Sequence, residues 1–138
     1  MTAIIQVVSA LILDVDSRML MTYRSATTKR PLMWEHPGGK VNDNETDSAA
    51  LIRELHEELG VSAIVGKLVS STRLDVEVTL ELRLYAVTII GAPHPSCDAV
   101  DSVDYVSLWD AIQYRPCAPS TYGYCRDIER FIAAKAAA

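Results

Sequence analysis

Residues 38–61 have the sequence GGKVNDNETDSAALIRELHEELGV, which contains the clearest helical pattern in the chain. We expect a helix from Thr46 to Leu59, because Thr46 or Asp47 can cap its start and Gly60, the preferred residue after a helix, follows it. The apolar residues fall on a stripe covering about a third of the helix circumference; they are Leu51, Ile52, Leu55 and Leu59. This stripe predicts that the helix packs against a core.

Three glutamates share another face of the predicted helix. At about 100° per residue, Glu54, Glu57 and Glu58 lie within about 100° of one another. Like charges three or four residues apart repel by about 0.2–0.5 kcal/mol per pair, and Arg53 offsets part of this through Glu57. A Mg²⁺ ion, which binds one or two carboxylates and substrate phosphates, would resolve the repulsion. A solvated acidic face would give the same pattern, so the helix alone leaves both interpretations open.

The segments around the helix favour a site for a metal and a phosphate. Gly38 and Gly39 lack a Cβ, so their backbone can approach a ligand closely, and Pro37 stiffens the chain before them. Several basic residues lie in segments that could fold over a polyphosphate; they are Arg24, Lys29, Arg30 and Lys40.

Gly39, Glu45 and the run from Arg53 to Val61 together resemble the signature of the Nudix hydrolases. Five residues separate Gly39 from Glu45, and seven more precede RELHEELGV. Seven fixed identities match by chance at a given start with a probability on the order of 10⁻⁹ to 10⁻⁸. The segment WEHPGGK at 34–40 further resembles the MutT-like nucleoside triphosphate hydrolases. The strand order around the signature is similar to the α/β/α sandwich of this family.

The resemblance implies a metal site on the helix. Arg53 would orient the glutamates, and Glu45 would support Arg53 from the preceding loop. The implied cofactor is Mg²⁺, with Mn²⁺ able to substitute. The implied reaction is the attack of a metal-activated water on the diphosphate linkage of a nucleoside diphosphate joined to a group X. The implied metal ligands are Glu54, Glu57, Glu58 and the Gly38 carbonyl.

The general base stays open between the helix and a later loop. Glu54 or Glu57 could serve from the helix, whereas MutT-like members use an acidic residue from a later loop. Asp98 and Asp101, in the expected loop at 91–104, are the candidates for that role. Aspartates that only solvate the loop would show the same pattern.

Four residues are candidate substrate contacts: Arg24, Trp34, Gly39 and Lys40. Arg24 closes a predicted strand, where a basic residue of the family often meets phosphate, although a surface arginine would look the same. Trp34 could stack on a base, but tryptophan at a strand end also belongs to many cores.

Two positions depart from the family pattern. Asn42 stands where many members have a glutamate, which leaves the number of bound metals open. His36 replaces the usual aromatic residue and could either face the substrate or pack.

The remaining sequence predicts one domain over residues 1–138, an α/β (α+β) sandwich with a mixed sheet. We expect the second strand to pair back on the first, and Val76–Ile90 to have one wet face because its apolar residues alternate. The expected strands are Ile4–Asp14, Met19–Arg24, Ala63–Thr72, Val76–Ile90 and Tyr105–Leu108, and further helices are expected at Trp109–Tyr114 and from Ser120 onward.

Composition limits the partners and the compartment. Eighteen acidic residues outnumber 13 basic ones, a net charge of −5, which excludes broad binding to nucleic acid or an anionic membrane. Three cysteines without metal-ligand spacing favour a reducing compartment. The apolar run at 3–13 is too short to span a bilayer and does not look like a signal peptide. We therefore expect a cytoplasmic protein with a small nucleotide substrate; the resemblance adds a possible homodimer.

The function predicted from these observations is a Mg²⁺-dependent pyrophosphohydrolase that converts a nucleoside triphosphate to the monophosphate and pyrophosphate. Two alternatives remain. One is a hydrolase of a sugar nucleotide or a dinucleoside polyphosphate, because specificity depends on loops outside the signature. The other is a nucleotide-binding sensor of the same fold without catalysis, which usually has lost glutamates that are all present here.

Overall fold

The computed structural model describes residues 3–28 and 31–138, so the expected phosphate contacts Lys29 and Arg30 lie outside the described residues. A four-stranded sheet with the order β4-β1-β6-β5 forms the centre of the fold. Its strands are β1 (Ile4–Leu11), β4 (Gly38–Lys40), β5 (Ser62–Asp75) and β6 (Thr79–Ile90). The sheet is mixed, because β1 pairs parallel with β6 and antiparallel with β4.

A smaller antiparallel sheet has the order β3-β2-β7. It consists of β2 (Met19–Arg24), β3 (Trp34–Glu35) and β7 (Val100–Val106). The expected pairing of the second strand with the first is therefore wrong beyond a single bridge between Leu13 and Met19. Residues 19–22 are all buried, because Leu20 packs in the core beneath α1 while Met19 and Met21 pack in the core beneath α3; the strand lies between these cores and pairs with β3 and β7 instead.

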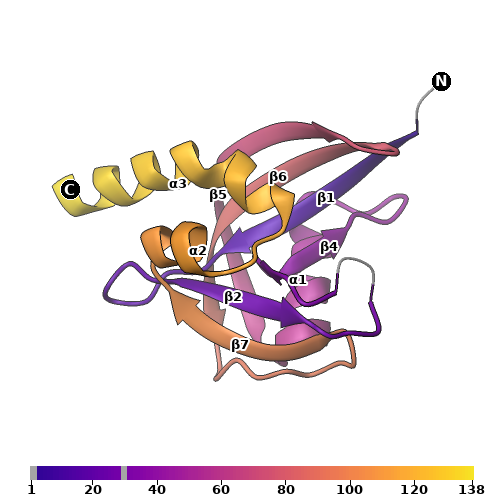
Figure 1. Ribbon diagram of the computed structural model, residues 1–138, viewed down its shortest axis with the longest axis horizontal. Helices are drawn as coiled ribbons and strands as arrows, with labels where there is room; N and C mark the ends of the chain where they lie inside the picture. The colour runs from indigo at the N-terminus through magenta and orange to yellow at the C-terminus, as the bar shows by residue number, and fades with distance from the viewer. Residues whose placement is uncertain (1–2, 29–30) are drawn as a thin grey trace.

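Helices cover both faces of the larger sheet, as Figure 1 shows: α1 (Asp47–Leu59) packs on one side and α3 (Pro119–Ala137) on the other. Alternation along β1 produces the two cores, since Val8 and Ala10 pack with α1 whereas Leu11 packs with α3. The short α2 (Leu108–Tyr114) precedes α3. The expected α/β/α sandwich with a mixed sheet is confirmed. No helix in the described ranges is long and apolar enough to cross a bilayer.

Two strand starts differ from the expectation by three residues or more. β6 begins at Thr79 instead of Val76, because residues 76–78 form the bend between β5 and β6. β7 begins at Val100 instead of Tyr105, which makes the preceding loop shorter than expected. Asp101 consequently lies in a strand.

Both ends of α1 are fixed to the rest of the fold. At its start, the Thr46 hydroxyl accepts a hydrogen bond from the Ala49 N–H at 3.1 Å, which confirms the expected cap. Asp47 in the first turn joins the helix to β6, because Arg83 Nε lies 2.6 Å and the Tyr85 hydroxyl 2.5 Å from its Oδ2.

The C-terminal end of α1 is held by the segment that follows β6. Gly60 adopts a left-handed conformation with φ 68°, as the helix-end prediction requires. The N–H groups of His94 and Ser96 then donate to the carbonyls of Leu59 and Glu58, at 3.1 and 2.9 Å. These bonds place the chain before β7 directly beside the acidic face of the helix.

The packing of α1 generates a stability prediction. Leu55 is fully buried, whereas Ile52, expected in the same apolar stripe, is 42% exposed. Leu55→Ala should therefore lower the free energy of unfolding by about 2–5 kcal/mol, because it leaves a cavity under the helix. Ile52→Ala is the matched control and should cost less than about 1 kcal/mol. Urea unfolding curves measure both values, and equal losses would contradict this packing.

Candidate active site

A cavity of about 310 Å³ lies along the acidic face of α1. Residues from β2, β3, β4, α1 and the start of β7 form its walls, so segments far apart in the sequence meet there. The lining includes all three predicted metal-binding glutamates together with Gly38, Gly39 and Arg24. The full set is Arg24, Glu35, Gly38, Gly39, Glu54, Glu57, Glu58, Cys97, Ala99 and Val100.

Arg53 organises the glutamates from behind the cavity. Its Nε and Nη2 each lie 2.9 Å from a different oxygen of Glu45, a bidentate contact, and Nη2 also donates to the Lys40 carbonyl at 3.1 Å. Nη1 donates to Glu54 Oε1 at 2.8 Å and lies 3.7 Å from Glu57 Oε2. The guanidinium thus connects the loop before α1 to two of the three glutamates, as the expected orienting role requires.

Glu45 remains ionised because of this contact. Hydrogen bonding to the Arg53 guanidinium, with help from the Asn42 N–H, lowers the pKa of the Glu45 carboxyl to about 2. The same contacts with Glu45 and Glu54 raise the pKa of Arg53. The charge pair therefore persists throughout the range in which an enzyme works.

The two glycines of β4 are required by close contacts. Gly38 has φ 153°, and a Cβ there would lie 2.0 Å from the Val8 carbonyl oxygen of β1. A Cβ on Gly39 would lie 2.5 Å from the carboxyl carbon of Glu54. Glu54 therefore occupies the space that a side chain at residue 39 would need, so a Cβ there would have to displace its carboxylate.

Glu58 is the most electrostatically crowded carboxylate. Burial raises its pKa well above the usual value, and the negative charges of Glu54 and Glu35 raise it further. A hydrogen bond between the Glu58 and Glu54 carboxyls acts in the same direction, whereas one from the Gly38 backbone partly opposes it. A single positive charge between Glu54 and Glu58 would relieve this repulsion.

The donor set fits a hard divalent cation, because carboxylate oxygens from one helix meet in one cavity with room for a phosphate. Within residues 3–28 and 31–138, no three His, Cys, Asp or Glu side chains form a preassembled metal cluster. Mg²⁺ takes oxygen ligands from carboxylates, water and substrate, so the chemistry of the carboxylates that line the cavity fits this ion.

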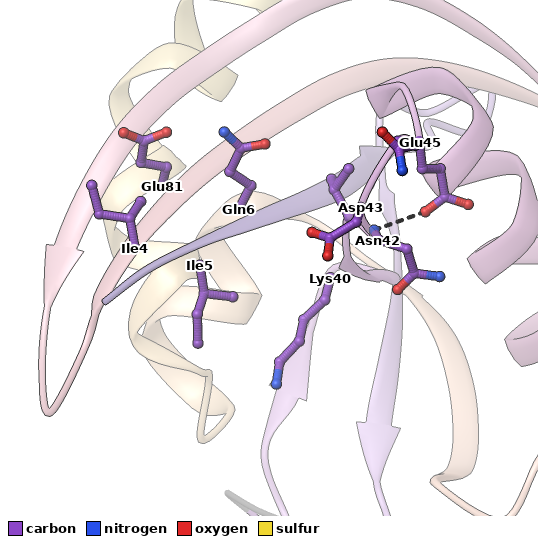
Figure 2. A pocket seen from close by; sticks show the side chains of 10 residues that line it. Ile4, Ile5, Gln6, Lys40, Asn42, Asp43, Glu45 and Glu81 are labelled. Carbon is purple, nitrogen blue, oxygen red and sulfur yellow. Dashed lines mark hydrogen bonds between the residues drawn. The ribbon is translucent and has the colours of Figure 1, made fainter. Parts of the chain in front are cut away.

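Two predicted substrate contacts lie away from the cavity. Lys40 is exposed and lines a separate open groove with Asn42, Asp43 and Glu45, shown in Figure 2. Trp34 packs in the smaller sheet. Its ring lies 5.0 Å from that of Tyr23, and the Arg115 guanidinium lies 4.3 Å above it. Of the alternatives left open for Trp34, the contacts favour packing.

The two candidate bases from the later segment differ in position. Asp98 is exposed on the turn between Cys97 and Ala99, both of which line the cavity. Asp101 lies on β7, so its expected place in a loop is wrong. Its side chain is exposed, and it is not among the residues that line the cavity. Of the two aspartates, Asp98 is therefore the one whose two chain neighbours both line the cavity.

His36 is buried, with 4% of its surface exposed. Its Nε2 lies 3.3 Å from the Met19 sulfur, and its ring contacts Tyr124 edge-on at 5.9 Å. Burial lowers the pKa of His36 to about 4, so the imidazole is neutral near pH 7. The structure therefore favours the packing interpretation.

The sequence prediction missed four lining residues: Glu35, Cys97, Ala99 and Val100. Glu35 is part of the segment WEHPGGK, so its acidic side chain beside the glycines was an available signal. Cys97 gave no such signal, because the bonds from His94 and Ser96 to the end of α1 place it at the cavity.

Comparison with known proteins identifies the family. A model described as the NUDIX domain matches residues 4–121. The chain belongs to the Nudix hydrolase family. The residues that form the cavity and the Arg53 contacts all fall within the matched range. This Nudix chain is an enzyme that hydrolyses pyrophosphate bonds in nucleotide substrates.

Three proteins illustrate its similarity. The Nudix chain is 35% identical over 135 residues to a CTP pyrophosphohydrolase of Escherichia coli (strain K12), covering 96% of this chain and 95% of that one. It is 37% identical over 57 residues to an 8-oxo-dGTP diphosphatase of Proteus vulgaris, covering 41% and 51%. The solution structure of a MutT protein from methicillin-resistant Staphylococcus aureus 252 matches with a TM-score of 0.69 and 31% identity, covering 97% and 99%. The expected MutT-like resemblance is confirmed.

The contact between Gly39 and Glu54 generates a prediction. Gly39→Ala should displace the Glu54 carboxylate and lower nucleotide hydrolysis by at least about tenfold, because a catalytic group would be misplaced. Gly123→Ala is the control: its Cβ would meet only Thr72 Cγ2 at 3.3 Å, so activity should stay near that of the parent chain. Initial rates of both variants, with circular dichroism to verify folding, provide the comparison. Full activity of Gly39→Ala would show that the position of Glu54 is not critical.

Proposed function

We propose that this chain is a Mg²⁺-dependent nucleoside triphosphate pyrophosphohydrolase that produces a nucleoside monophosphate and pyrophosphate. The observation that carries the proposal is the convergence of Glu54, Glu57 and Glu58 on one cavity, where burial and the neighbouring carboxylates raise the pKa of Glu58. The similarity to a CTP pyrophosphohydrolase along nearly the full length of both chains supports a triphosphate substrate.

The proposed metal ligands are Glu54, Glu57, Glu58 and the Gly38 carbonyl. When bound there, Mg²⁺ would lower the pKa of the attacking water and neutralise charge on the phosphate oxygens, with Mn²⁺ able to replace it. Arg53 keeps Glu54 in place through the 2.8 Å contact, while Glu45 holds Arg53.

The reaction adds one water to the triphosphate. The water oxygen forms a bond to phosphorus, the bridging P–O bond breaks, and pyrophosphate leaves as the water proton passes to a base. Glu57 suits this proton transfer, because its side chain is 56% exposed and lies farther from the Arg53 guanidinium than Glu54 does. Asp98, on the turn beside the cavity, is the alternative base.

Arg24 and Gly39 line the cavity and are the proposed phosphate contacts. Arg24 brings positive charge to the phosphates, and Gly39 leaves room for their close approach. The homodimer and the location in the cell stay predictions.

Glu57→Gln should lower kcat by about 10² to 10⁴ with CTP and Mg²⁺, because it removes a carboxylate needed for metal binding or proton transfer. Glu129→Gln, an exposed residue of α3, is the matched charge control and should retain the parent rate. Chelation with EDTA should stop turnover, and added Mg²⁺ should restore it. Release of monophosphate and pyrophosphate is followed by chromatography.

The assay should include other nucleoside triphosphates, 8-oxo-dGTP, a sugar nucleotide and a dinucleoside polyphosphate. Faster turnover of either of the last two would replace the triphosphate assignment with the corresponding alternative. If the folded protein with Mg²⁺ bound nucleotides tightly but hydrolysed none of them, it would be a nucleotide sensor and the proposed function would be wrong.

A further inference from the structure

Arg24 and Glu35 form an ion pair in the wall of the cavity. Thr22 pairs with Glu35 across β2 and β3, and Arg24 follows Thr22 by two residues, so Arg24 and Glu35 lie on the same face of the smaller sheet. Arg24 Nη1 lies 2.6 Å from Glu35 Oε1, with the two side chains 22% and 16% exposed. Both residues line the cavity that contains the three glutamates of α1.

An irregularity between β2 and β7 accompanies this arrangement. Tyr23 pairs with Ser102 and Arg24 with Val100, which leaves Asp101 without a partner in the register. A bulge of this kind changes the direction of nearby side chains. Val100 also lines the cavity, so the irregular pairing occurs where Arg24 enters the wall.

The charges at this position pose a problem for an anionic substrate. Among the described residues that line the cavity, Arg24 is the only cation, whereas Glu35, Glu54, Glu57 and Glu58 are acidic. Glu35 increases the crowding, because its charge contributes to raising the pKa of Glu58. A fourth carboxylate should weaken phosphate binding unless it has a compensating role, and its bond to Arg24 supplies one.

We propose that Glu35 is a positioning residue that holds the Arg24 guanidinium in the cavity, where it meets the phosphate chain of the substrate. This inference rests on the proposed function, because it takes the cavity as the polyphosphate site. Simple electrostatics and positioning have opposite consequences: removal of the Glu35 charge alone should strengthen anion binding, whereas loss of the acceptor for Arg24 should weaken it.

The test measures equilibrium binding of α,β-methylene-CTP in Mg²⁺ buffer by calorimetry, together with KM and kcat for CTP. Glu35→Ala should raise the Kd and KM about tenfold while kcat changes less, because the Arg24 guanidinium loses its 2.6 Å bond to Glu35. Glu35→Gln retains an acceptor oxygen for Arg24 and should stay within about threefold of the parent chain. Arg24→Ala and the double variant should match each other within about twofold, because the bond from Glu35 to Arg24 is already absent in both.

The control is Asp104→Asn, which weakens an ion pair of the same length, 2.6 Å to Arg115, outside the cavity lining. It should leave analogue binding unchanged. If Glu35→Ala does not fold, Glu35→Asp serves instead, because its shorter side chain withdraws the acceptor and should also raise the Kd.

Two results would overturn the proposal. Analogue binding by Glu35→Ala as tight as that of the parent chain, or tighter, would show that Glu35 does not position Arg24. Unchanged analogue affinity with an altered Mg²⁺ requirement would make Glu35 a metal ligand. Normal analogue binding without hydrolysis in the parent chain would reject the proposed function, but the comparison of variants would still decide the role of Glu35.

Discussion

The Arg53 guanidinium connects the loop before α1, the end of β4 and the acidic face of the helix through bonds to Glu45, the Lys40 carbonyl and Glu54. The spacing of the glutamates depends on this contact, because like charges on one helical face would otherwise separate. The bidentate pair between Arg53 and Glu45 persists at every working pH, since Glu45 stays ionised there. The cavity can therefore concentrate negative charge without unfolding the helix that carries it.

The remainder of the fold serves to hold that helix in place. Asp47 binds Arg83 and Tyr85 of β6 at one end, while the backbone of residues 94 and 96 caps the other. Buried leucines on the opposite face attach α1 to the larger sheet. The glycines of β4 then bring the backbone against Glu54. The crowded carboxylates of the site thus rest on a helix that is held by contacts outside the cavity.

Local patterns in the sequence were sufficient for much of this description. The capping residue Thr46, Gly60 and the periodic leucines predict α1 correctly, because the signals lie within the helix itself. The glutamates and Arg53 could be assigned through the family signature. The partner of β2 could not be predicted, because apolar residues on both faces do not specify which sheet contains the strand. The start of β7 and the presence of Cys97 at the cavity depend on how the segment after β6 folds over α1. The 42% exposure of Ile52 depends on how the rest of the fold packs against α1, which the helical period alone does not specify.

The proposed function depends on a cation held inside this cavity by carboxylates that include Glu54 and Glu58. Crystals soaked in Mn²⁺ and measured at the manganese absorption edge would locate the ion directly through its anomalous scattering. We expect one strong anomalous peak in contact with carboxylate oxygens of Glu54 and Glu58, lost in the Glu58→Gln variant. A cavity without a peak at saturating Mn²⁺, or a peak only in the open groove beside Asp43 and Glu45, would contradict the account.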